Sequence, residues 1–293
     1  MVQLGLLIFL IYIWFEQPVR IFFKYFLLCF ICHNSYFVSA KDRSIDSLTA
    51  GVKNSKHDTT KVKYLNALSY KFLDTKPDTA IIMGKEALAL ATKNNFLKGI
   101  TNANNNLGVF YTVMGNYPLA LQHHLNAYKI RVKVGNKKTI AVSAGNIGAV
   151  YYEQKLYDKA LEYFLIGLNI DEELGNKEGV ARHLGNISTI YKSKKNYPDA
   201  IKYCEKAMQM NKELNNKKSL AKNFGNLGII YMDLKNDDKA LEYLLQENKI
   251  VEELGNTRGL STNLSNLGQT YFNKQLFKRA EDCYLRSLEL AKE

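Results

Sequence analysis

The imidazole and carboxylate side chains are the first candidates for catalysis or metal binding. His123 and His124 are adjacent, and neighbours on a helix point about 100° apart, so the two cannot ligate one metal ion from ideal positions. His183 is single, and the acidic runs 171–173 and 252–253 stand near expected helix ends, which is typical of a solvated face. The sequence has no glycine-rich phosphate loop, serine elbow or metal-ligand spacing. We therefore expect no enzyme, no metal ion and no cofactor.

A row of asparagines is the second candidate, and its chemistry is hydrogen bonding. A primary amide offers both a donor and an acceptor, so a row of amides can bond a peptide backbone without reading its sequence. The same amides can instead satisfy the backbone end of a neighbouring unit, and both interpretations stay open. The row recurs every 40 residues, at Asn106, Asn146, Asn186, Asn226 and Asn266, with Asn66 as a degenerate first member.

The spacing of the asparagines is also the spacing of a structural unit. Segments such as NIGAVY (146–151) and NLGIIY (226–231) recur with it. A fixed period of this size is typical of a solenoid of stacked repeats. The same period of 40 residues appears in a series of six alanines: Ala80, Ala120, Ala160, Ala200, Ala240 and Ala280.

Each unit is expected to form two helices. Apolar residues recur at three and four positions within each half, which is the helical period. Pro118 and Pro198 stand where the first turn of a helix tolerates proline, with Asn116 and Asn196 just upstream as capping residues. We expect antiparallel helices of roughly 15 to 17 residues, about 25 Å each. Glycines mark expected helix ends at Gly135, Gly175 and Gly255.

Small residues at fixed positions indicate where these helices cross. No side chain larger than a methyl group fits at a close crossing, which explains the alanine series. A second series follows the asparagines, with Ser188 as its one departure, and tyrosines such as Tyr151 fill the space beside it. The glycines of this series are Gly108, Gly148, Gly228 and Gly268.

The pattern resembles the tetratricopeptide repeat family. One repeat supplies the family's signature at Ile147, Gly148, Tyr151, Ala160, Phe164 and Gly167, whereas the first repeat matches more loosely and His124 and Cys204 replace the large apolar residue. The unit is longer than the usual length of about 34 residues. The resemblance implies an all-α fold, a right-handed α-solenoid of about six helix-turn-helix repeats. We expect these repeats at about 60–96, 97–136, 137–176, 177–216, 217–256 and 257–293.

In this family the first helix of each repeat lines a concave groove, so the resemblance places the asparagine row there. Residues four before and three after each asparagine share its face. We predict a basic floor from Arg182, Lys192 and Lys222, suited to an acidic residue near the centre of an extended peptide. Apolar pockets are expected from Tyr152, Ile229, Met232 and Phe272.

Residues 1–40 do not belong to the array. Their second apolar run has Arg20 and Lys24 before it and ends in Val38-Ser39-Ala40, an order that fits a secretory signal peptide cleaved after Ala40. This predicts a secreted or periplasmic protein, and the alternative is an uncleaved membrane anchor. Residues 41–59 are expected to cap the first repeat through a short helix, Ile45 to Val52.

Charge and cysteine content narrow the partners. The chain carries a net charge of +12, which favours acidic partners. Nucleic-acid binding requires a continuous basic stripe with aromatic platforms, and the scattered lysines form none. Cys204 and Cys283 lie two repeats apart, too far for a disulfide.

Two functional classes follow from these observations. The first is a non-catalytic protein-protein interaction module that binds an extended peptide or partner segment in the groove. The alternative is the input region of a bacterial signal-transduction protein, whose output domain is absent from this sequence. A purely structural spacer would bind no ligand. No polar capping helix follows the last repeat, so we expect either further sequence beyond Glu293 or an end-to-end contact, including a homo-oligomer, through that face.

Overall fold

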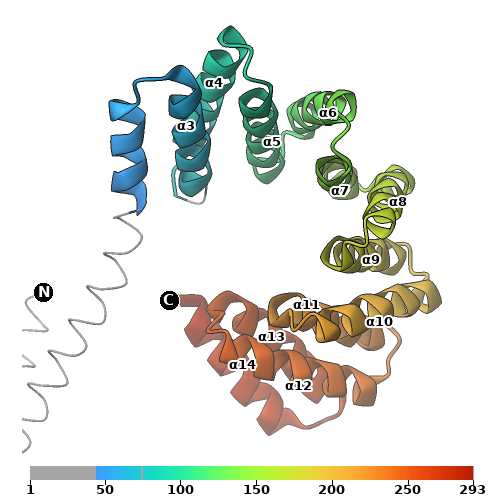
Figure 1. The fold of residues 1–293 in the computed structure, drawn as a ribbon. Helices are drawn as coiled ribbons and strands as arrows, with labels where there is room; N and C mark the ends of the chain where they lie inside the picture. Colours follow the sequence, from blue (N-terminus) through green and yellow to red (C-terminus); the bar gives the residue numbers. More distant parts are fainter. Residues whose placement is uncertain (1–43, 74, 293) are drawn as a thin grey trace, which may run out of the picture. The chain divides into compact units, whose positions relative to one another are not determined.

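The computed structural model describes residues 44–73 and 75–292, and all regular elements in these ranges are α-helices. The prediction of an all-α helical repeat array is confirmed, and six helix pairs follow one another (Figure 1). The predicted leader and its cleavage after Ala40 lie outside the described residues. The pairs are α3 (Asp58–Phe72) with α4 (Pro77–Lys93), α5 (Leu97–Val113) with α6 (Tyr117–Val134), α7 (Lys137–Glu153) with α8 (Tyr157–Glu173), α9 (Lys177–Ser193) with α10 (Tyr197–Glu213), α11 (Lys217–Asp233) with α12 (Asp237–Glu253), and α13 (Thr257–Asn273) with α14 (Phe277–Lys292).

The helices belong to two compact units, one ending at Ala103 and the other covering Asn104–Glu293. In the first unit, α3 packs against α4. A further helix over 44–54 packs on this pair, because Val52 lies against the buried cluster of Leu65, Ala87 and Ala103. The short helix predicted at Ile45–Val52 is therefore present, and it covers the first repeat.

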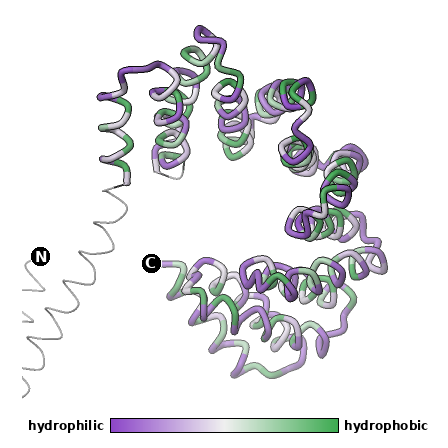
Figure 2. The backbone as a smooth tube through the Cα atoms, viewed as in Figure 1, coloured by the Kyte–Doolittle hydropathy of each residue, from purple (hydrophilic) through white to green (hydrophobic). Residues whose placement is uncertain are grey.

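In the second unit each helix packs on its neighbours in sequence from α6 to α14. The first helices of successive repeats also touch one another, from α7 to α9, α9 to α11 and α11 to α13. Successive second helices make at most slight contact. The first helices therefore form a closed row, whereas successive second helices lie farther apart. Figure 2 shows the alternation of apolar and polar residues along each helix that this stacking requires.

The turns repeat twice as often as the sequence suggests. One residue adopts a left-handed backbone every 20 residues from Asn95 to Gln275. Glycine fills this position at Gly115, Gly135, Gly175 and Gly255, but lysine, asparagine or glutamine fills it elsewhere. The turn within a repeat thus has the same form as the turn between repeats. Asparagine side chains then cap the next helix by accepting a backbone N–H, at Asn116, Asn136, Asn196, Asn216, Asn236 and Asn256.

Small residues lie at the crossings inside each pair. All six alanines of the 40-residue series are buried. A Cβ atom added to Gly148 would lie 2.9 Å from the Phe164 ring and 3.2 Å from the Ala160 carbonyl oxygen. His124 takes the place of Phe164 one repeat earlier, buried against Gly108.

At one crossing Ser188 replaces the glycine of the series, and the surrounding residues accommodate its larger side chain. The Ser188 hydroxyl donates to the Ala200 carbonyl oxygen at 2.7 Å. The opposing position holds the small, buried Cys204 in place of an aromatic or leucine. Cys204 and Cys283 are both free thiols. None of the helices in the described ranges combines the length and apolar content that a membrane span requires.

Candidate functional site

The asparagine row lies on the first helices at one constant depth. Asn106, Asn146, Asn186, Asn226 and Asn266 are all half-buried, each just before a fully or largely buried leucine or isoleucine. Because the row repeats with the helices, it forms a line along α7, α9, α11 and α13 in the second unit. We call the side of these four helices that carries Asn146, Asn186, Asn226 and Asn266 the first-helix face.

The hydrogen bonds of these amides differ along the row. Asn146 donates to the Asn105 side-chain oxygen at 2.8 Å. Within the described ranges, the side chains of Asn186, Asn226 and Asn266 make no hydrogen bond, and none of these four asparagines bonds the backbone of a neighbouring repeat. The last three therefore have hydrogen-bonding groups available for a ligand.

The predicted basic floor is partly neutralised by nearby acids. The Arg182 guanidinium, on an exposed side chain, lies 3.5 Å from the Asp171 carboxylate. Burial lowers the pKa of the half-buried Lys192, and the Asp233 carboxylate opposes that shift. Lys222 is exposed and makes no ion pair with any described residue. Lys222 is therefore the cation with most freedom to meet a ligand.

The four predicted apolar residues also differ in their availability. The Tyr152 hydroxyl shares a hydrogen bond of 3.1 Å with the Ser193 hydroxyl, and Met232 packs against the core between α11 and α13. Ile229 is half-buried. Phe272 is 53% exposed, with its ring edge-on to Phe277 at 5.5 Å. The apolar surface open to a ligand therefore lies at Ile229 and Phe272.

One expectation about the acidic runs is wrong. Asp171 is fully buried, not solvated, and faces the buried His183 with 3.3 Å between carboxylate oxygen and Nε2. Asn176 donates to the same carboxylate at 2.7 Å. This bond replaces one that the buried carboxylate would otherwise make to water. Burial lowers the pKa of His183, so its imidazole is neutral.

The Asp171–His183 contact belongs to a series at the junctions between repeats. The equivalent positions hold Arg131 hydrogen-bonded to Ser143, and Asn211 donating to Asn223 at 2.8 Å. These three junctions thus hold different polar pairs, whereas the next one has Val251 at the first position, and Asn263 bonds Glu247 and the Leu244 carbonyl oxygen instead. A group of three or more side chains able to hold a metal ion is absent from the described part of the chain.

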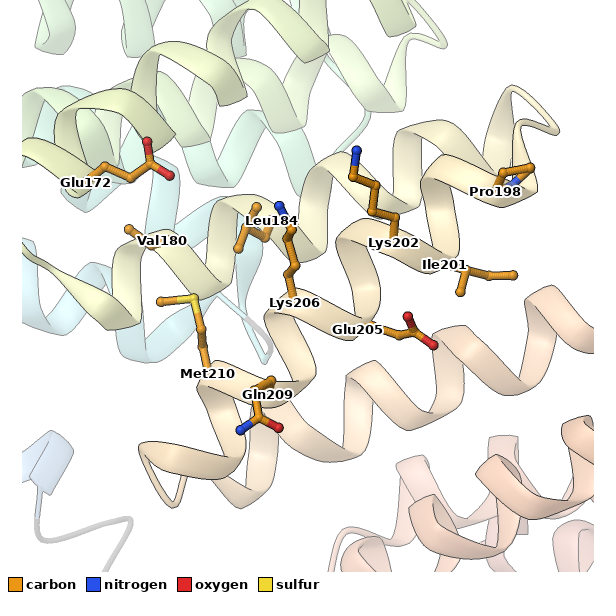
Figure 3. Close-up of a pocket in the computed structure, with 10 residues that line it drawn as sticks. All are labelled: Glu172, Val180, Leu184, Pro198, Ile201, Lys202, Glu205, Lys206, Gln209 and Met210. Atoms are coloured by element: carbon orange, nitrogen blue, oxygen red, sulfur yellow. The ribbon is translucent and has the colours of Figure 1, made fainter.

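A hollow that sequence reasoning missed lies on the opposite side of the array. It measures about 830 Å³ and is bounded by α8, α9 and α10. Its apolar lining comes from Val180, Leu184, Ile201 and Met210, and its charged lining from Glu172, Lys202, Glu205 and Lys206. Figure 3 shows Lys202 and Lys206 extending in the same direction from α10. We call this hollow the α10 groove.

These features define a helical repeat scaffold that offers surfaces to other molecules. The family model of the tetratricopeptide repeat matches residues 99–173, 139–213, 179–246 and 219–293. The chain belongs to the tetratricopeptide repeat family. Such an array is a protein-interaction module and generally a non-catalytic scaffold. Comparison with curated protein sequences found no significant match.

Several solved structures share the fold. The apo form of RapI is 15% identical with a TM-score of 0.69, over 92% of this chain and 98% of RapI. A Rap protein complexed with competence and sporulation factor is 16% identical with a TM-score of 0.66, over 89% of this chain and 72% of the Rap protein. A signal transduction ATPase with a tetratricopeptide repeat sensor, from Pyrococcus horikoshii, is 16% identical with a TM-score of 0.69, over 88% of this chain and 41% of the ATPase. At these identities the likeness shows the fold alone.

Proposed function

We propose that the first-helix face binds an extended segment of a protein partner. The observation that carries this proposal is the set of three half-buried asparagine side chains, on α9, α11 and α13, that make no hydrogen bond within the described residues. None of their polar atoms is among the buried atoms that lack a partner in the described residues, so these amides are open to water and equally to a ligand. A ligand backbone would replace their bonds to water with bonds of its own.

The spacing of the helices suits an extended backbone. Packed helices lie about 8–10 Å apart, and an extended chain rises about 3.3 Å per residue. Successive asparagines would then meet about every third residue of the ligand. A row of amides that bonds only backbone atoms would tolerate many sequences.

The surroundings of the row favour a ligand with acidic and apolar residues. Lys222 is unpaired and Arg182 is exposed, so a carboxylate near them would gain from the charge. Phe272 and Ile229 offer apolar contact near the C-terminal end of the row. The complex of a Rap protein with competence and sporulation factor supports the idea that a scaffold of this shape can hold a partner.

The proposal is tested with peptides selected from a displayed random library against the full chain. Affinities would be measured for the native protein and for the triple variant N186A/N226A/N266A. Losing three ligand hydrogen bonds should weaken binding by about 10- to 1000-fold. A peptide methylated on its backbone nitrogens should lose affinity to a similar extent, because it lacks the donors.

A matched control replaces three exposed amides on second helices: N126A/N169A/Q246A. This control should bind the selected peptides with native affinity. If the two triple variants bind equally well, with equal helicity by circular dichroism, the asparagine row is not the binding site.

The second candidate is the sensor region of a signal-transduction protein. The similarity to the repeat sensor of the signal transduction ATPase favours it. A sensor must change conformation when it binds, whereas a simple docking module need not. Hydrogen exchange with and without a selected peptide separates the two: protection extending to the second helices α12 and α14, which carry none of the row, supports the sensor, and protection confined to α9, α11 and α13 contradicts it.

A further inference from the structure

We propose that the α10 groove is a second docking surface, which takes an amphipathic helix of a protein partner bearing carboxylates beside its apolar face. The groove lies on the second helices, away from the asparagine row. It would therefore act independently of the peptide site proposed above.

The first observation is the chemistry of the groove floor. Val180 and Leu184 are largely buried, and Ile201 and Met210 are half-buried beside them. These side chains offer no hydrogen bonds. An extended peptide laid on them would leave backbone N–H and C=O groups without partners, and such groups are costly to desolvate. A helix satisfies its own backbone and can present a purely apolar stripe to the floor.

The second observation is the dimension of the groove. Its lining on α10 runs from Pro198 to Met210, just over three helical turns or roughly 18 Å. Because α8 and α10 make at most slight contact, side chains of α9 reach the floor between them beside Ile201 and Met210 of α10. A partner helix lying there would be flanked by two helices and supported by a third, an arrangement that ridge-and-groove packing favours.

The third observation is the charge on the rim. Lys202 and Lys206 are four residues apart, so they lie on one face of α10. Neither pairs with a described carboxylate, and Glu172 and Glu205 are likewise without an ion pair. The two lysines share one helical spacing and would meet carboxylates at that spacing on a ligand, while Glu172 and Glu205 balance the total charge of the lining.

The lysine pair on the rim is particular to this repeat. At the position of Lys202, α8 carries Glu162, α12 carries Glu242 and α14 carries Asp282. At the position of Glu205, α8, α12 and α14 carry exposed leucines. Since the repeats share one scaffold, the exchange of acid for lysine at α10 changes the surface without a packing reason. This points to recognition at that one level of the array.

The test uses the full chain and two designed helical probes about four turns long. The probes share one leucine face, and they carry either glutamates or lysines at i and i+4 beside it. The acidic probe should bind in fluorescence anisotropy titrations, and the basic probe should bind at least about tenfold more weakly. The variant K202E/K206E should reverse this preference.

The control is K129E/K133E, which reverses two exposed lysines at the same spacing on α6, outside both proposed surfaces. It changes the net charge equally and should leave both probe affinities within about twofold of native. If the two double variants changed probe affinity equally, the overall charge of the protein would explain the result, and the proposal would be overturned. Absence of saturable binding by the acidic probe would also overturn it.

Two further outcomes would assign the groove to another occupant. An acidic probe with a central proline, which cannot form a continuous helix, should bind poorly; equal affinity would exclude a helical ligand. Sedimentation of the unliganded chain should show no self-association that K202E/K206E removes. Such self-association would make a second copy of the chain the occupant.

Discussion

The two proposed surfaces of residues 104–293 differ in the hydrogen-bonding groups that they offer to the backbone of a ligand. On the first-helix face, Asn186, Asn226 and Asn266 present unpaired amides in a row. In the α10 groove, Val180 and Leu184 contribute to a floor without hydrogen-bonding side chains. An extended chain needs partners for its backbone and suits the first surface, whereas a helix needs none and suits the second. If both proposals hold, the array selects ligands by secondary structure before it selects them by sequence.

The difference has its origin in the stacking. First helices touch their successors and second helices make at most slight contact with theirs. Side chains on the closed row are half-buried and regularly spaced, which makes a continuous polar line possible. On the side of the second helices, Val180 and Leu184 of α9 line the α10 groove with only a small exposed fraction. Substitutions in the packing between helices should therefore affect both surfaces. Substitutions of side chains that line one surface should affect only that surface.

Acidification should produce the largest effect, and it should weaken both surfaces together. His124 is 2% exposed, and burial, with the nearby charges of Arg131 and His123, lowers its pKa from 6.5 to about 4. The unfolded chain binds the proton more readily, so this contribution is complete above pH 6.5 and is lost as the pH falls toward 4. The loss amounts to about 3 kcal/mol. Urea unfolding at several pH values measures it.

The variant H124F isolates that contribution, because Phe164 occupies the equivalent position one repeat later. The free energy of unfolding of H124F should depend less on pH between 4 and 6.5 than that of the native protein. An unchanged pH profile would show that His124 is not the titrating group.

The next largest effect is expected from Gly148→Ala. The added methyl group meets the Phe164 ring and the Ala160 backbone oxygen, and the oxygen cannot move without moving a helix. Overpacking of this kind should lower the free energy of unfolding by about 1–3 kcal/mol. The matched control is Gly185→Ala on α9, where the nearest atom to the new methyl group is 3.7 Å away. That control should be neutral or slightly stabilising, and similar losses for both variants would contradict the crossing argument.

Charge reversal on the first-helix face should have a smaller effect. The variant R182E/K222E should weaken an acidic extended peptide by roughly tenfold or less, because both side chains are exposed and Arg182 is shared with Asp171. The same variant should not alter binding of an acidic helix in the α10 groove. Titrations at low and high salt would check it, since the difference should shrink as salt rises. Unchanged affinity for the extended peptide would show that the predicted basic floor does not contribute to binding.

The smallest effect concerns the turns. Lys155, Lys195 and Lys235 hold left-handed backbones at φ 59, 58 and 59°. Replacing each by glycine relieves this strain but increases the conformational entropy of the unfolded chain, so the net gain should be only about 0.5 kcal/mol per site. Thermal unfolding of the triple variant measures the sum, and both ligand affinities should stay native. A loss of stability would show that lysine contacts outweigh the backbone strain.

Much of the fold could be predicted from the sequence, but less could be predicted about the two surfaces. The 40-residue alanine and asparagine series predicted the stacked helix pairs, because a repeated crossing demands a repeated small residue. The 20-residue repeat of the turns was hidden, since Lys155 and Gln275 give no glycine signal at left-handed positions. Asp171 stands in an acidic run whose sequence suggests a solvated face. Its burial depends on two residues outside its own helix: Asn176 in the turn after α8, and His183 on α9 of the next repeat.

The candidate site shows the same limit. The spacing predicted which face carries the asparagines, but not that Asn146 is bonded to Asn105 while the next three are available. The α10 groove escaped prediction because it depends on the distance between helices that are not neighbours in sequence. Its one sequence signal was Lys202, which stands where the equivalent helices carry acids.

The central claim is that the two surfaces recognise different backbones, and one paired binding experiment tests it most directly. A library-selected extended peptide and the acidic helical probe would each be titrated against N186A/N226A/N266A and K202E/K206E. We predict that the first variant loses the extended peptide and keeps the helix, and that the second variant does the reverse. If either variant loses both ligands while remaining folded, or if neither variant distinguishes them, the claim is wrong.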